Sequence, residues 1–94
     1  MYIVSGYLTI ASDRRDEYLS RCTDIVIAAR SAPGCVDFAL SADLLEPDRV
    51  NVFECWQDVE SLDRFRESGP DDELIELIIR GDTWQHEVAA SINI

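Results

Sequence analysis

The sequence has 94 residues, enough for one domain over residues 1–94, and its 47% hydrophobic and 29% charged residues are typical of a folded protein. The formal net charge of −11 repels nucleic-acid phosphates and anionic lipid headgroups, so neither is expected as a partner. No apolar run approaches the roughly 18 residues that a spanning helix needs. Residues 1–6 lack the basic start and apolar core of a signal peptide, so we expect a cytoplasmic protein.

The first third of the chain predicts a strand followed by a helix. Residues 2–11 are rich in β-branched and aromatic types, which is typical of a strand. A serine and an aspartate then supply a capping signal, and apolar residues across 18–29 recur at steps of one, three and four. This spacing makes one apolar stripe on a helix. The dipeptide Pro33-Gly34 ends the helix.

The middle of the chain predicts an antiparallel hairpin. Residues 35–42 alternate apolar and polar side chains and form a second strand, and residues 50–56 form a third. A proline-containing turn over 46–48 joins them, since proline cannot sit inside a sheet ladder. On the third strand, Glu54 and Trp56 share one face because they are two residues apart.

The last third predicts a broken helix and a final strand. Asp58 caps a short helix that Gly69-Pro70 interrupts, and the break is suited to act as a flexible lid over a cleft. A further helical turn or two restarts near the proline and ends at Gly81. Residues 83–94 are expected to form the last strand.

This order, β-α-β-β-α-β, predicts a ferredoxin-like α+β fold with a four-stranded antiparallel sheet and both helices on one face. The first strand is apolar on both faces, because Ile3 and Tyr7 oppose Val4 and Leu8. The helices cover one face, so we expect a second copy of the chain to cover the other and form a homodimer. A monomer with an exposed apolar face, or a different partner, remains the alternative.

The cysteines and the histidine indicate no metal site. Cys22, Cys35 and Cys55 are an odd set without C-x-x-C spacing, and His86 alone cannot anchor a histidine-rich site. Each cysteine falls in a segment whose pattern predicts burial, which favours inert core thiols. A catalytic cysteine paired with His86 has no support in the sequence. No glycine-rich phosphate loop is present either, so no cofactor is expected.

One stretch is specific enough to suggest a family. Residues 53–62 read Phe-Glu-Cys-Trp-Gln-Asp-Val-Glu-Ser-Leu, which resembles the E-x-W-x-D/S-x-E-x-L stretch of antibiotic biosynthesis monooxygenase domains. The Pro33-Gly34-Cys35 turn is similar to that family's P-G-(C/F) turn between first helix and second strand. Length, element order and the acidic loop at 46–48 agree too, so the resemblance covers essentially the whole chain.

The resemblance implies both an assembly and a reaction. Members of the family form dimeric α+β barrels, in which the sheets of two ferredoxin-like protomers close into a barrel. Its characterised members include oxygenases that act on phenols, anthrones or quinols without flavin, haem or metal. The resemblance therefore implies that this protein is a cofactor-independent monooxygenase that binds a small electron-rich aromatic and molecular oxygen. Once deprotonated, such a substrate can itself supply electrons to oxygen.

The family's functional residues carry over only in part. Trp56 matches a tryptophan near the substrate of polyketide-oxidising relatives, where its indole N–H can donate a hydrogen bond. An asparagine four residues earlier in those relatives is Val52 here, and a tyrosine of the next helix is Leu62. The haem-degrading branch has asparagine and tryptophan where this chain has Gly6 and Phe65, and it has a histidine soon after that tryptophan, where this chain has none. Haem degradation is therefore disfavoured.

Eight residues are candidates for the site. The expected catalytic residues are Trp56, His86 and Tyr7, and the expected substrate-binding residues are Phe38, Asn51, Glu54, Phe65 and Trp84. Histidine is the side chain best suited to proton transfer near neutral pH, and Tyr7 and Phe38 are expected to line the space between sheet and helices. Each has a structural alternative, such as a packing anchor for Trp56 or an interface carboxylate for Glu54.

Two other functions remain open from the sequence. The same cleft would suit a non-catalytic binding domain for an apolar metabolite. Dimeric α+β barrels also host isomerases and cyclases, because a fold alone does not decide the chemistry.

Overall fold

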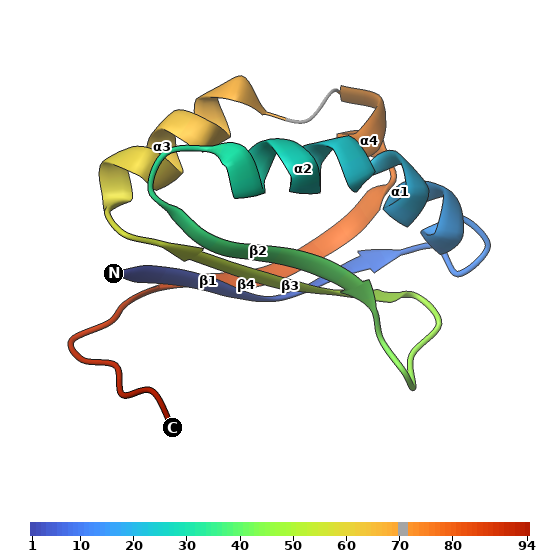
Figure 1. Ribbon diagram of the computed structural model, residues 1–94. Helices are drawn as coiled ribbons and strands as arrows, with labels where there is room; N and C mark the ends of the chain where they lie inside the picture. The colour runs from blue at the N-terminus through green and yellow to red at the C-terminus, as the bar shows by residue number, and fades with distance from the viewer. Residues whose placement is uncertain (70–71) are drawn as a thin grey trace.

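The computed structural model describes residues 1–69 and 72–94, and its centre is a four-stranded antiparallel sheet (Figure 1). The strands run in the order β2-β3-β1-β4. Their bounds are β1 Tyr2–Ile10, β2 Cys35–Ala42, β3 Arg49–Trp56 and β4 Ile78–Glu87. β1 lies at the centre and pairs antiparallel with both β3 and β4. The predicted hairpin of the second and third strands is confirmed.

All the described helices lie on one face of this sheet (Figure 1). Their bounds are α1 Arg15–Arg21, α2 Thr23–Ser31, α3 Val59–Ser68 and α4 Asp72–Glu76. Asp58 caps α3 as predicted, because its Oδ1 accepts a hydrogen bond from the Ser61 backbone N–H at 2.8 Å. The arrangement confirms the ferredoxin-like α+β fold.

The first helix differs from the prediction of one continuous element. Cys22 ends α1 and begins α2, with backbone angles that remain in the right-handed region. Its N–H is shared between the carbonyl oxygens of Tyr18 and Leu19, at 3.0 and 3.2 Å. A locally tightened turn of this kind interrupts the regular hydrogen-bond pattern while the apolar stripe continues.

The boundaries of the last strand were predicted wrongly. β4 begins at Ile78 rather than residue 83 and ends at Glu87, and residues 88–94 lie outside it. Gly81, expected to end a helix, pairs with Leu8 inside the ladder. Pairing with the central strand overrides the local helical pattern of this apolar segment. The predicted restart at Pro70 lies outside the described residues.

The core between helices and sheet has two parts. One cluster of buried residues lies towards α3 and contains Val4, Ala29, Phe38, Trp56 and Leu62. The other lies towards α1 and α4 and contains Ile10, Tyr18, Cys22, Val50 and Leu74. Partly buried apolar side chains such as Ile25 and Leu40 contact both clusters.

A close approach of two strands requires a glycine at the centre of the sheet. Gly6 of β1 has a φ of +140°, a conformation that side-chain-bearing residues rarely adopt. A Cβ atom there would overlap the backbone carbonyl oxygen of Asp82 in β4. The position therefore admits glycine alone without a backbone shift.

The other face of the sheet is left open by the helices. Its centre carries two aromatic side chains, Phe53 of β3 and Trp84 of β4, both in register with Ser5 of β1. Trp84 is 70% exposed and Phe53 is 38% exposed. The predicted alternation of β3 thus places Phe53 on the face opposite the helices, and these exposed aromatics are available for packing.

Candidate functional site

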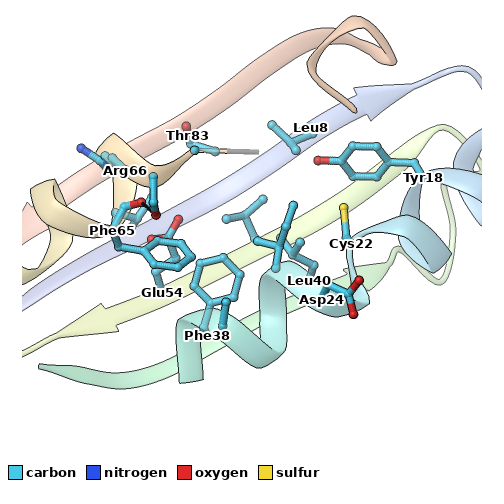
Figure 2. A pocket seen from close by; sticks show the side chains of 16 residues that line it. Leu8, Tyr18, Cys22, Asp24, Phe38, Leu40, Glu54, Phe65, Arg66 and Thr83 are labelled. Carbon is cyan, nitrogen blue, oxygen red and sulfur yellow. Dashed lines mark hydrogen bonds between the residues drawn. The ribbon is translucent and has the colours of Figure 1, made fainter. Parts of the chain in front are cut away.

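A cavity of about 720 Å³ lies between the sheet and the helices (Figure 2). Side chains of all four strands form its floor, and α1, α2, α3 and residues that flank these helices supply the rest of the wall. Most of the lining is apolar, with polar groups placed at a few points. Such a composition and size are typical of sites for small organic ligands.

Glu54 and Trp56 form a hydrogen-bonded pair at one end of this cavity. Both point to the helix side of β3, and the indole Nε1–H of Trp56 donates to Glu54 Oε1 at 3.0 Å. Trp56 is 0% exposed and lies in the core behind the cavity, whereas Glu54 is half-buried and lines it. The indole therefore holds the carboxylate in a fixed orientation.

The environment of Glu54 makes it a better proton acceptor than an ordinary glutamate. Burial raises the pKa of its carboxyl group, because a charged carboxylate loses hydration in the cavity wall. The Trp56 hydrogen bond and the positive charge of Arg66 act in the opposite direction, and the net pKa is still raised. A basic carboxylate in an apolar cleft is suited to general base catalysis.

Two phenylalanines form the apolar wall beside this pair. Phe38 of β2 is buried and meets Phe65 of α3 edge to face, with 5.7 Å between ring centroids. Phe65 also lies 5.3 Å from the Trp56 ring, centroid to centroid. Phe38 and Phe65 line the cavity and give a planar aromatic ligand favourable stacking surfaces next to the carboxylate, while Trp56 supports them from behind.

Arg66 is a site residue that the sequence analysis missed. It follows Phe65 on α3, lines the cavity near Glu54, and donates a hydrogen bond from Nη1 to Gln85 Oε1 of β4 at 3.0 Å (Figure 2). The only signal in the sequence was its position next to an inward-facing aromatic residue. Its guanidinium places a positive charge beside the carboxylate, where an anionic form of a ligand would be stabilised.

Two residues assigned to the core stripe of the first helix also reach the cavity. The Tyr18 hydroxyl points into it from α1, and the buried Cys22 thiol lies beside the ring (Figure 2). Burial raises the pKa of both groups, so both stay protonated. Helical periodicity predicted their burial correctly but could not show that they face a cavity.

Four of the eight predicted site residues lie on the opposite face of the sheet. Tyr7 and Asn51 are in register with each other, and Trp84 and His86 lie on the same face of β4. The expectation that Tyr7 lines the space between sheet and helices is wrong, because alternation along β1 places Val4 and Leu8 on that side. The structure therefore brings together Phe38, Glu54, Trp56 and Phe65, and their catalytic and binding roles stay predictions.

Contacts on the open face explain the presence of Tyr7 and Asn51. The Arg49 guanidinium lies 4.0 Å from the centre of the Tyr7 ring, a cation–π contact. Asn51 accepts from Arg49 Nε at 2.8 Å and donates from Nδ2 to Asp43 Oδ1 at 3.0 Å. The hydrogen bond from Asn51, two backbone N–H donors and the nearby charge of Arg49 lower the pKa of Asp43 to about 2. The network stabilises the turn between β2 and β3.

The described residues form neither a metal-binding cluster nor a membrane-spanning helix. Over 1–69 and 72–94, no three His, Cys, Asp or Glu side chains gather as a metal would require, and Cys22, Cys35 and Cys55 are free thiols. In the same part of the chain, no helix combines the length and the apolar character needed to cross a bilayer.

The chain belongs to the antibiotic biosynthesis monooxygenase family, whose sequence model matches residues 1–73. Its fold is similar to that of a "putative antibiotic biosynthesis monooxygenase" from Deinococcus radiodurans, with a TM-score of 0.86, 21% identity, and coverage of 100% of this chain and 98% of that one. It is also similar to Rv0793 from Mycobacterium tuberculosis, with a TM-score of 0.80, 16% identity, and coverage of 98% of each chain. At these identities the likeness shows the fold alone.

A curated relative gives a weaker match. The uncharacterized protein sll1783 from Synechocystis sp. is 26% identical over 61 residues, which cover 65% of this chain. The match spans 42% of that relative, so the chain corresponds to less than half of its length.

Proposed function

We propose that this protein is a cofactor-independent monooxygenase that oxidises a small electron-rich aromatic, of the phenol, quinol or anthrone type, in the cavity between sheet and helices. The observation that carries the proposal is the basic carboxylate of Glu54 in an aromatic-lined cavity. Family membership supports the same reaction class.

The proposed reaction balances without an external reductant. For an anthrone-type CH₂ group, Glu54 takes one C–H proton, and the resulting carbanion passes one electron to O₂. The substrate radical and superoxide then form a C–O bond, and the proton on Glu54 converts the peroxide to a hydroperoxide. Glu54 removes the second C–H proton while the O–O bond breaks, and that proton leaves with the hydroxide as water. One CH₂ and one O₂ thus give one C=O and one H₂O.

The described residues have distinct parts in this scheme. Glu54 moves the protons, Trp56 orients its carboxylate, and Arg66 stabilises the anionic substrate and the superoxide. Phe38 and Phe65 hold the aromatic plane and exclude water from the reacting carbon. Every group required is supplied by one protomer.

The test is oxygen uptake by the purified protein with hydroquinones, naphthols and anthrones, compared with the spontaneous rate. Uptake in which one atom of each O₂ enters the product and the other leaves as water supports the proposal, and Trp56→Phe is expected to reduce it. Glu67→Gln, a change at an exposed position of α3 away from the cavity, serves as the control. Binding without oxygen uptake across the panel would instead indicate a binding domain. Product formation without oxygen would indicate an isomerase or cyclase.

We also infer that the open face of the sheet packs against a second copy of the chain. The exposed aromatics Phe53 and Trp84 at the centre of this face support the proposal, because an uncovered apolar sheet face is unfavourable in water. A two-fold axis would bring identical faces together and bury both.

A further inference from the structure

The cavity carries a second polar group at the end opposite Glu54. Figure 2 shows the Tyr18 hydroxyl directed into the cavity at one end, whereas Glu54 and Arg66 lie at the other. Tyr18 is 6% exposed, so its hydroxyl is a buried group of the cavity wall. Asp24 lies at the rim of the same end, but it is exposed to solvent.

The Tyr18 hydroxyl is a strong donor with a weak partner. Within the described residues it has no nitrogen or oxygen hydrogen-bond partner, and its hydrogen-bonding neighbour is the Cys22 thiol. Sulfur is a poor acceptor, so the capacity of the hydroxyl to donate is largely unused. Burial raises the pKa of Tyr18 above its ordinary value of 10.0, so the proton stays on the oxygen. An unused buried donor favours a ligand that brings an acceptor.

The wall between the two ends is apolar apart from Thr83 of β4 (Figure 2). Val4 and Leu8 of β1, Leu40 of β2, Val52 of β3 and Ile25 of α2 line it. The cavity therefore presents a base and a cation at one end, a largely apolar middle, and the buried Tyr18 hydroxyl at the other end. A matching ligand is elongated and flat, with an oxygen function at each end. A single-ring phenol would satisfy one end only.

We infer that Tyr18 is a specificity-determining residue whose hydroxyl donates a hydrogen bond to an acceptor oxygen at the far end of the substrate. The substrate class is then a fused-ring aromatic that carries its oxidisable group at the Glu54 end and a carbonyl at the Tyr18 end. This assignment of the reacting end rests on the proposed function, whereas recognition of the far-end carbonyl does not.

The test compares two probes of nearly equal shape, 6-acetyl-2-naphthol and 6-ethyl-2-naphthol. They differ by the carbonyl oxygen, and their binding is measured by calorimetry without oxygen, so that no turnover is needed. On Tyr18→Phe, the ratio of affinities for acetyl over ethyl compound is expected to fall about 3- to 10-fold, the effect of one neutral hydrogen bond. Affinity for the ethyl compound should change by less than about twofold. Tyr2→Phe, the same change at a tyrosine outside the cavity wall, should leave the ratio unaltered.

A second measurement needs no variant. The carbonyl stretch of bound, ¹³C-labelled 6-acetyl-2-naphthol should move to lower wavenumber relative to the probe in an aprotic solvent, since a hydrogen bond weakens the C=O bond. An unshifted carbonyl, an unchanged affinity ratio in Tyr18→Phe, or failure of both probes to bind would overturn the inference. A normal carbonyl preference without oxygen uptake by any substrate would instead count against the monooxygenase alone.

Discussion

Replacing Glu54 by glutamine should separate the chemistry of the cavity from its shape. The amide has the size of the carboxylate, and its oxygen can still accept the Trp56 N–H that now lies 3.0 Å from Oε1. The change therefore removes the base while the packing against the aromatic wall is kept. The kcat for oxygen uptake is expected to fall about 10²- to 10⁴-fold, the usual contribution of a general base. This range corresponds to about 2.7–5.5 kcal/mol of transition-state stabilisation.

The pH dependence of the wild-type protein provides an independent check. Only the carboxylate can take the proton, so kcat/KM should rise with pH as Glu54 ionises. Burial raises the pKa of this group, so the acidic limb should lie above the usual range of a glutamate. Trp56→Phe removes a hydrogen bond that lowers this pKa, so it should move the limb to higher pH. The measurement of kcat/KM against pH requires a substrate that does not itself ionise within the pH range measured.

Glu54→Gln, which should lower the activity, should raise the stability of the folded protein. Because the pKa of Glu54 is raised on folding, the folded state keeps a proton that the unfolded state has lost, and stability falls as pH rises through this window. Glutamine carries no charge to bury, so Glu54→Gln should melt at a higher temperature than wild type at neutral pH, and the advantage should vanish in acid.

The activity measurement decides the role of Glu54. Oxygen uptake by Glu54→Gln within twofold of wild type, at unchanged pH dependence, would refute the role of Glu54 as the base.

Three further predictions concern the sheet and the core. Gly6→Ala should destabilise the fold by at least about 2 kcal/mol in urea unfolding, because a Cβ would overlap the Asp82 carbonyl, whereas Gly81→Ala meets only an ordinary 3.6 Å contact and should be nearly neutral. Phe53→Glu should convert a dimer to monomers in sedimentation, and Ile27→Glu, a change at an exposed site of α2, should not. Leu62→Ala, at a fully buried position, should lower the free energy of unfolding by about 2–5 kcal/mol. A much smaller loss would mean that neighbouring side chains move in to fill the space left by Leu62.

The sequence by itself determined the order and type of the elements and the family. Alternation along the strands placed Glu54 and Trp56 on one face, and the capping signal at Asp58 located the start of α3. These features are local, because side-chain direction and capping depend on residues a few positions apart. The last strand was misplaced because its apolar residues suit either helix or strand, and only pairing with β1 decided between them.

Only the tertiary structure decided which candidates meet. A two-residue period shows that side chains share a face, but it does not show which face the helices cover. Tyr7 and His86 were therefore grouped with Trp56. In the structure, the sheet separates these two residues from Trp56. The same limit concealed Tyr18 and Arg66, whose helical positions are compatible with either packing or a cavity. A cavity is the space left where elements distant in sequence fail to fill the gap between them. Its lining therefore depends on packing across the whole domain, which no local pattern specifies.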